Sequence, residues 1–200
     1  AGTESITVDW GTASGTISLI IDDGSTITTP TLDVTVTTNL LENPSFEYDF
    51  TSWNFATQGT GAGTNTITTT DVQHLTKAAV VDVTGTGASY VVQLYQDNLD
   101  VVNGTSYTLS FWAKADQAGD QLTPHIETVG TWEQHLVPVA ISLTTGWTKY
   151  EIEFISIEAS DPAARLSFDF GLDIGTYYLD DVWFGETADY PSTTLGTITG

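Results

Sequence analysis

Apolar and polar residues alternate along Tyr150-Glu151-Ile152-Glu153-Phe154-Ile155-Ser156-Ile157. Because successive side chains of a β-strand point to opposite faces, this pattern is typical of a strand with one face in the core and the other in water. We expect Glu151, Glu153 and Ser156 near the water-facing side. The segment therefore indicates a β-sheet that buries one face.

Residues 39–186 contain further segments of this kind, separated by turn residues, and no segment keeps a helical period. The strand candidates are 65–70, 78–83, 90–96, 106–115, 122–129, 136–142, 148–157, 165–170 and 177–184. Many short strands with turns between them predict an all-β sandwich of two antiparallel sheets. In this sandwich we assign Trp53 and Trp112 to the core.

Residues 1–38 and 187–200 differ from this central region. The first stretch alternates at 5–10, 16–21 and 32–36, which is too few strands to close a sandwich. It resembles the last strands of an immunoglobulin-like domain of the polycystic-kidney-disease type. These strands either belong to such a domain or pair with the central region. Residues 187–200 are polar and rich in Thr and Gly, which is typical of a linker to another module.

The charge balance excludes several classes of partner. Lys and Arg together number 4 against 26 Asp and Glu, and the formal net charge is −22. Nucleic acids and anionic membranes require a basic surface, so neutral polymers and cations remain as partners. Strong negative charge favours solubility and is common in saline habitats, so we expect a marine or halophilic source. The chain has no Cys and hence no disulfide or thiolate chemistry.

Four motifs, taken in order, resemble those of the carbohydrate-binding modules of families 4, 9 and 22. The first is Asn39-Leu40-Leu41-Glu42-Asn43-Pro44-Ser45-Phe46-Glu47 ahead of Trp53, and the second is Gly104-Thr105-Ser106-Tyr107-Thr108-Leu109-Ser110-Phe111-Trp112-Ala113-Lys114-Ala115. The others are Phe168-Asp169-Phe170-Gly171 and Tyr178-Leu179-Asp180-Asp181-Val182. The resemblance covers residues 39–186. It implies a jelly roll with a cleft on one concave face for a single glycan chain, a structural calcium away from the cleft, and no catalysis.

The resemblance also implies which residues line the cleft. A sugar ring needs aromatic platforms for its C–H face and bidentate polar groups for its hydroxyls. Transferred by position, these residues are Tyr90, Gln93, Gln96, His125, Glu127, Trp132, Arg165 and Asp169. Tyr95 is a further candidate because it is in phase with Gln93, whereas Tyr90 is out of phase with Gln93 unless a bulge intervenes.

Arg165 stands out because it is the only Arg in the chain. Arg165 and Asp169 are four residues apart, so a regular strand places both on one face, while Leu166, Phe168 and Phe170 face the core. The guanidinium can either fork onto sugar hydroxyls or pair with Asp169. A purely structural ion pair is the alternative for Arg165, and core packing is the alternative for Trp132 and Tyr90.

The implied calcium site takes the carboxylates of Glu47 and Asp180 and the backbone carbonyls of Ser45 and Lys77. Hard oxygen donors of these types are what calcium requires. Since Glu47 and Asp180 lie near the two ends of the domain, one ion would tie the first strand to the last. The alternative is that both carboxylates are simply solvated.

Three functions remain open. The first is non-catalytic binding of a polysaccharide outside the cell, with laminarin-type β-1,3-glucan favoured and xylan or cellulose as alternatives. The second is a glycoside hydrolase with two carboxylates. Glu151-Ile152-Glu153-Phe154 resembles the Glu-Ile-Asp motif of laminarinases, but Glu153 replaces its Asp, and Ile155 and Ser156 occupy the positions of the third acid. The third is a structural spacer without a ligand.

Overall fold

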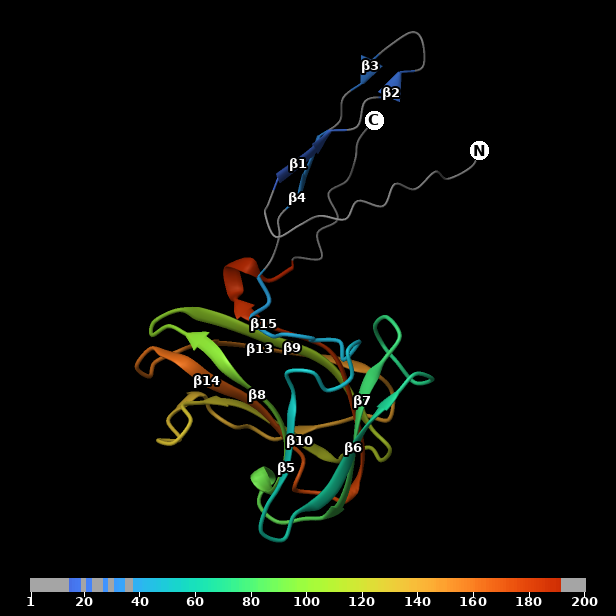
Figure 1. Cartoon of the computed structure of the whole chain (residues 1–200), viewed down its shortest axis with the longest axis vertical. Coiled ribbons are helices and arrows are strands. Elements are labelled where there is room, and N and C mark those ends of the chain that lie inside the picture. The colour runs from blue at the N-terminus through green and yellow to red at the C-terminus, as the bar shows by residue number, and fades with distance from the viewer. Residues whose placement is uncertain (1–14, 19–20, 23–26, 29–30, 35–37, 192–200) are drawn as a thin grey trace. The chain divides into compact units, whose positions relative to one another are not determined.

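The computed structural model describes residues 15–18, 21–22, 27–28, 31–34 and 38–191 (Figure 1). Its contacts divide the chain into two units, residues 1–38 with 189–200 and residues 39–188. In the first unit β1 (Gly15–Ser18) pairs with β4 (Thr31–Val34), and β2 (Ile21–Asp22) pairs with β3 (Ile27–Thr28), both antiparallel. The strand expected at 5–10 lies outside the described residues, and the likeness to a polycystic-kidney-disease domain stays a prediction.

The second unit is a sandwich of two antiparallel sheets, which confirms the predicted all-β jelly-roll class. One sheet follows the order β11 (Gln134–Leu136), β10 (Gln121–Glu127), β14 (Asp161–Asp169), β8 (Val92–Val101) and β5 (Asn54–Thr57), and β12 (Ile141–Ser142) also pairs with β10. The other follows the order β13 (Thr148–Ile155), β9 (Ser106–Ala115), β15 (Gly175–Glu186), β7 (Ala78–Gly85) and β6 (Ala62–Thr68). Two short 3-10 turns, η1 (Ser89–Val91) and η2 (Thr187–Asp189), complete the described elements. No described helix is long and apolar enough to cross a membrane.

The core forms where the inward faces of the two sheets meet. Phe111 of β9 packs edge-on against Phe168 of β14, with ring centres 5.0 Å apart, and both side chains are fully buried. Leu166 and Phe170 are fully buried as well, so the predicted inward face of this strand is confirmed. Buried aromatic rings contribute strongly to the energetics of a core. The core therefore fixes which side chains of β14 point away from it, toward the outer face of the six-stranded sheet.

Two expectations from the sequence are wrong. Ser156 is completely buried, because the alternation that begins at Tyr150 continues and places it on the inward face, where its hydroxyl bonds His135 Nδ1 at 2.9 Å. Trp112 is only half-buried and lies on the outer face of β9, since its neighbours Phe111 and Ala113 occupy the core. Trp53, in contrast, is buried as expected. In both wrong cases strand phase outweighs side-chain polarity.

The chain enters and leaves the sandwich at the same place. Leu40 N–H donates to the Phe184 carbonyl at 2.7 Å. The Asn39 side chain donates to the Val182 carbonyl at 3.0 Å and accepts from Phe184 N–H at 3.1 Å. These bonds add the first residues of the domain to the edge of its last strand, β15.

Candidate functional site

The outer face of the six-stranded sheet carries polar side chains in register across its strands. Asp169 of β14 pairs with Gln93 of β8 on one side and with Thr123 of β10 on the other. Four residues earlier, Arg165 pairs with Glu127. Because paired residues in neighbouring strands share a face, these side chains form one continuous polar floor.

A cavity of about 750 Å³ opens over this floor. Seven of the eight residues expected in the cleft line it, namely Tyr90, Gln93, His125, Glu127, Trp132, Arg165 and Asp169. Tyr95 lines it too, as does a set that the sequence did not indicate: Ala56, Thr57, Gln58, Ser89, Gln134 and Pro138. We call this cavity the groove. The structure therefore brings the expected residues together, while their contacts with a ligand stay a prediction.

Two exposed aromatic rings border the groove from different elements. Tyr90 lies in η1, immediately before β8, and is 53% exposed. It lines the groove together with Gln93 because the 3-10 turn ends the strand alternation that would have put them on opposite faces. Trp132 lies in the loop between β10 and β11, is 57% exposed and has a φ of +63°. The backbone bond from Trp132 N–H to the Thr128 carbonyl, at 2.9 Å, holds this loop in place.

Arg165 makes its ion pair with Asp97 and stacks on Tyr95. Its Nε donates to Asp97 Oδ1 at 2.7 Å, and its guanidinium carbon lies 3.8 Å from the centre of the Tyr95 ring. The pairing partner proposed from the sequence, Asp169, instead accepts from Gln93 Nε2 at 2.9 Å and from the Ser167 hydroxyl at 2.8 Å. Asp97 and Asp169 are thus each held by hydrogen bonds to side chains of the same sheet, which makes the polar floor rigid.

His125 lies between two buried carboxylates. Its Nε2 is 3.4 Å from Glu127 Oε2, and its Nδ1 is 3.5 Å from Asp169 Oδ2. Burial alone would lower the pKa of His125, but the bond to Glu127 and the charges of Asp169 and Glu127 raise it overall. The pKa of Asp169 is raised, chiefly by burial. For Glu127 burial also acts to raise the pKa, but bonds from His125 and Gln134 outweigh it and leave the pKa lowered.

Three buried polar atoms in this region have no hydrogen-bond partner among the described residues. They are Thr123 Oγ1, His125 Nδ1 and Gln134 Oε1, all on β10 or β11. A buried polar atom without a partner costs free energy, so such atoms mark positions where a bound polar group would stabilise the protein. The β10 side of the groove is therefore suited to accept hydroxyl groups.

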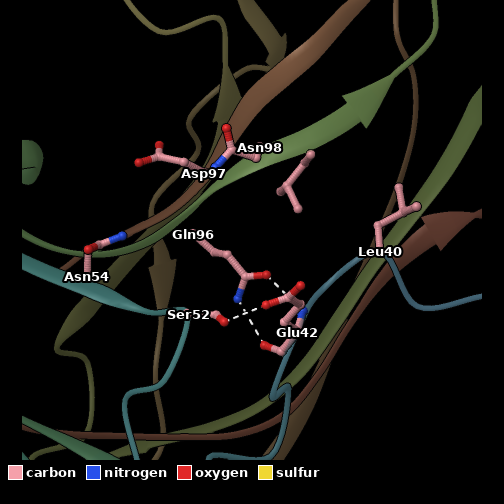
Figure 2. A pocket seen from close by; sticks show the side chains of 8 residues that line it. Leu40, Glu42, Ser52, Asn54, Gln96, Asp97 and Asn98 are labelled. Carbon is pink, nitrogen blue, oxygen red and sulfur yellow. Dashed lines mark hydrogen bonds between the residues drawn. The ribbon is translucent and has the colours of Figure 1, made fainter.

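Gln96 is not part of the groove. It is buried on the opposite face of β8 from Gln93, as residues three apart in a strand must be. Its Oε1 accepts from Glu42 N–H at 2.8 Å, and its Nε2 donates to the Glu42 carbonyl at 3.0 Å (Figure 2). The expected cleft role of Gln96 is replaced by a structural one that ties residue 42 to β8.

The four expected calcium ligands gather around residues 73–77. Glu47 Oε1 accepts from the N–H groups of Thr76 and Lys77 at 2.9 and 2.8 Å. Asp180 Oδ2 accepts from the N–H groups of Gln73 and His74 at 2.9 and 2.8 Å. Ser45 joins them through its hydroxyl, 3.1 Å from His74 Nδ1.

These bonds leave room for only part of a cation's ligand shell. The second oxygen of each carboxylate accepts one bond. Glu47 Oε2 accepts from the Thr76 hydroxyl, and Asp180 Oδ1 accepts from Asp181 N–H. Each therefore keeps one position for a hard cation. Within the described part of the chain no three His, Cys, Asp or Glu residues are placed to hold a metal ion, so carbonyls and water would have to supply the remaining ligands.

A sandwich with a rigid, polar groove between exposed aromatic rings defines a binding domain for a ligand that is both flat-faced and polar. The family comparison agrees with this class. Residues 38–173 match the carbohydrate binding domain family CBM_4_9, and the chain belongs to that family. No curated protein gives a sequence match.

Solved structures of carbohydrate-binding modules share the fold. A structure described as "CBM4 structure and function" matches with a TM-score of 0.60 and 20% identity, over 73% of this chain and 99% of its own. The CBM22-1 xylan-binding domain of Xyn10C from Paenibacillus barcinonensis matches with a TM-score of 0.53 and 17% identity, over 76% and 97%. A putative sugar binding protein from Bacteroides thetaiotaomicron matches with a TM-score of 0.58 and 16% identity, over 75% and 100%. At these identities the likeness concerns the fold.

Proposed function

We propose that the groove binds a neutral polysaccharide chain without catalysing its cleavage, and that the ligand is a β-glucan, with laminarin-type β-1,3-glucan favoured. The observation that carries this proposal is the pairing of Tyr90 and Trp132, both more than half exposed, with a floor of fixed polar groups. Exposed rings of this kind offer area to the C–H faces of sugars, while the floor offers donors and acceptors to their hydroxyls. We propose that this binding takes place outside the cell, where such polymers occur.

Charge supports a neutral ligand. The net charge of −22 repels acidic polymers at a distance, and Glu127 and Asp169 would face any carboxylate that entered the groove. Hydrogen bonds to sugar hydroxyls replace hydrogen bonds to water, so each adds little net free energy. We therefore expect a modest affinity, with Kd from about 1 μM to about 1 mM.

Calorimetric titration tests the proposal with laminarin, xylan and cellohexaose as three separate ligands. A lower Kd for laminarin than for the other two ligands supports the favoured ligand. Stronger binding of xylan or cellohexaose would assign the groove to one of the two alternatives instead. No heat and no gel retardation with any of the three polymers or oligomers would reject glycan binding.

The laminarinase-like pair does not lie in the groove. Glu151 and Glu153 are on the exposed face of β13, which belongs to the five-stranded sheet, whereas the groove lies on the six-stranded sheet. A reducing-sugar assay on laminarin tests catalysis independently of binding. Release of sugar that is lost in Glu127→Ala but kept in Arg165→Ala would contradict the non-catalytic proposal.

We also propose that calcium binds at the segment 73–77, held by Glu47 and Asp180 together with the carbonyls of Ser45 and Lys77. The support is that these residues, from distant parts of the sequence, meet there and that each carboxylate keeps one oxygen position open. Bound calcium would stabilise the fold there and take no part in the groove.

A further inference from the structure

A second cavity, of about 310 Å³, lies beside β8 and β5 (Figure 2). We call it the end pocket. Its lining residues are Leu40, Glu42, Ser52, Asn54, Gln96, Asp97, Asn98 and Leu99. None of these residues lines the groove, so the end pocket is a separate hollow in the surface.

The end pocket and the groove nevertheless meet at one ion pair. Asp97 lines the end pocket, while Arg165 and Tyr95 line the groove. Arg165 bonds Asp97 and stacks on Tyr95, and Tyr95 pairs in register with Asn54 of the end pocket. The two cavities are therefore neighbours that meet at the Arg165–Asp97 pair, although Gln96 lines the end pocket from the face of β8 opposite to the groove.

The end pocket also lies in line with the groove. Gln134 pairs with Glu127, Glu127 pairs with Arg165, and Arg165 bonds Asp97. This line crosses β11, β10, β14 and β8, which lie side by side at a spacing of about 4.8 Å. Trp132 stands at its first end and the end pocket at its last. A linear polymer that runs across the strands from Trp132 would reach the end pocket after passing the ion pair.

The lining of the end pocket matches a polar ring with an apolar face. The side-chain amides of Asn54 and Asn98 are exposed and bond no other described residue. Asn98 has a φ of +66°, next to a register shift between β8 and β14 that turns it out of the regular ladder. Leu40 and Leu99 supply apolar wall. Free amides beside aliphatic surface offer donors and acceptors together with C–H contact.

Hydrogen bonds among its lining residues hold the end pocket in shape. Gln96 bonds both backbone groups of Glu42, and the Ser52 hydroxyl donates to the Glu42 carboxylate at 2.5 Å. Arg165 offsets the charge of Asp97, and the Glu42 carboxylate leaves negative charge at the rim. This charge disfavours an acidic sugar and is compatible with a neutral one.

We propose that the end pocket is a terminal subsite, which takes one neutral sugar ring at the end of a polysaccharide chain bound in the groove. This inference rests on the proposed function of the groove. It assigns Asn54 and Asn98 as binding residues that hydrogen-bond the terminal ring. A chain long enough to pass the Arg165–Asp97 pair gains these contacts, and a shorter one held near Trp132 does not.

The test measures affinity against chain length. Laminari-, cello- and xylo-oligosaccharides of increasing length are titrated into the wild type and into the double variant Asn54→Ala/Asn98→Gly. Glycine is chosen at residue 98 because it adopts a positive φ without strain. Gln117→Ala, an exposed amide outside both cavities, is the matched control. Amide resonances of Asn54 and Asn98 in NMR spectra provide a second readout.

We expect the affinity of the wild type to rise with length until the chain enters the end pocket. In the double variant the longest oligosaccharide should bind about two- to tenfold more weakly, as for one or two lost hydrogen bonds, with short ones unchanged. Equal length dependence in both proteins, or side-chain amide resonances that do not move with the longest ligand, overturns the terminal subsite and leaves the groove intact. If no oligosaccharide binds the wild type, both the groove proposal and this one are rejected.

Discussion

The guanidinium carbon of Arg165 lies 3.8 Å from the centre of the Tyr95 ring. Arg165 is the only arginine of the chain, and it lies on β14, where it also bonds Asp97 of β8. Only 15% of the Arg165 side chain is exposed, so the cation is largely removed from water, which strengthens its attraction to the ring. The stack therefore contributes to stability as well as to the shape of the groove.

Replacing Arg165 should lower the stability of the domain. We expect Arg165→Ala to lower the melting temperature by about 2–8 °C, since a partly buried cation–π contact with its ion pair contributes about 1–2 kcal/mol. Arg165→Lys should lose less, because it keeps the charge but not the forked bond to Asp97. Thermal unfolding followed by circular dichroism measures the change. An unchanged melting temperature in Arg165→Ala would show that the stack adds nothing to stability.

Replacing Trp132 should affect binding alone. The ring is 57% exposed and lies in a loop, so Trp132→Ala removes little buried area. We expect glycan affinity to fall by about tenfold or more, with the melting temperature within about 1 °C of the wild type. Tyr48→Ala, an exposed aromatic residue outside both cavities, is the control and should bind normally. Equal affinity in Trp132→Ala and Tyr48→Ala would remove Trp132 from the binding surface.

The stability of the domain should decrease as the pH rises above 6.5, the ordinary pKa of His125. The folded pKa of His125 is raised, so folding favours its protonated form. That contribution is complete below the unfolded pKa and is lost as the pH rises through the folded pKa. The raised pKa of Asp169 acts with the same sign, but from 3.8 upward, in a more acidic range.

Melting temperatures of the wild type and His125→Asn, measured from about pH 5.5 to about pH 8.5, test this dependence. The charged groups beside His125 are Glu127 and Asp169, the charge of Arg165 acts on Glu127, and all three remain in the variant. We expect the wild type to lose stability across this range and the variant to lose clearly less. Parallel curves for the two proteins would contradict a protonated His125 between its carboxylates.

Removing the charge of Asp120 should stabilise the fold. Burial and the nearby charges of Asp173 and Asp116 raise the pKa of Asp120, and its Oδ2 has no hydrogen-bond partner among the described residues. A carboxyl group with a raised folded pKa costs stability above that pKa, and the cost disappears as the pH falls toward the unfolded value of 3.8. We expect Asp120→Asn to raise the melting temperature by about 1–4 °C at pH 7.

The exposed Asp100→Asn controls for the overall charge, because it also removes one of the acidic groups but lines neither cavity. Its melting temperature should change less than that of Asp120→Asn. If the two variants gain equally, the local repulsion at Asp120 is not the cause. The difference in melting temperature between the two variants should also disappear as the pH is lowered toward 3.8.

Chelation should lower the melting temperature if calcium binds at Glu47 and Asp180. An ion that binds only the folded state stabilises it by about 2.7 kcal/mol at a hundred times its Kd, which corresponds to about 5–10 °C here. The melting temperature of Glu47→Gln should be the same in the presence and in the absence of calcium. Identical melting of the wild type in excess calcium and in EDTA would refute the site.

Strand alternation accounts for most of what the sequence predicted. It placed Arg165 and Asp169 on one face and Phe168 on the other, and the structure agrees for all three. The same rule, applied strictly, would have excluded Gln96, which is three residues from Gln93. It would also have buried Ser156 and turned Trp112 outward. These errors came from weighing residue type above phase.

Other features had no periodic signal to find. β5 has only four residues at the edge of its sheet, so Asn54 and the neighbouring groove residue Ala56 could not be recognised. Tyr90 lies in a 3-10 turn, and Trp132 adopts a positive φ in a loop. The position of such residues depends on contacts between distant segments, as in the bond between Arg165 and Asp97. Pairing between strands far apart in sequence is not encoded in any local pattern.

The joint of Asn39 and Leu40 with Val182 and Phe184 has a mechanical consequence. Because the first and last segments of the sandwich are hydrogen-bonded neighbours, tension applied through both would separate them one bond at a time, as in a zipper. The strands of the groove belong to the opposite sheet, so tension at this joint acts first on the hydrogen bonds of the joint itself. In a domain pulled at this one corner, the hydrogen bonds of the joint are thus expected to yield before the strand pairing that shapes the groove.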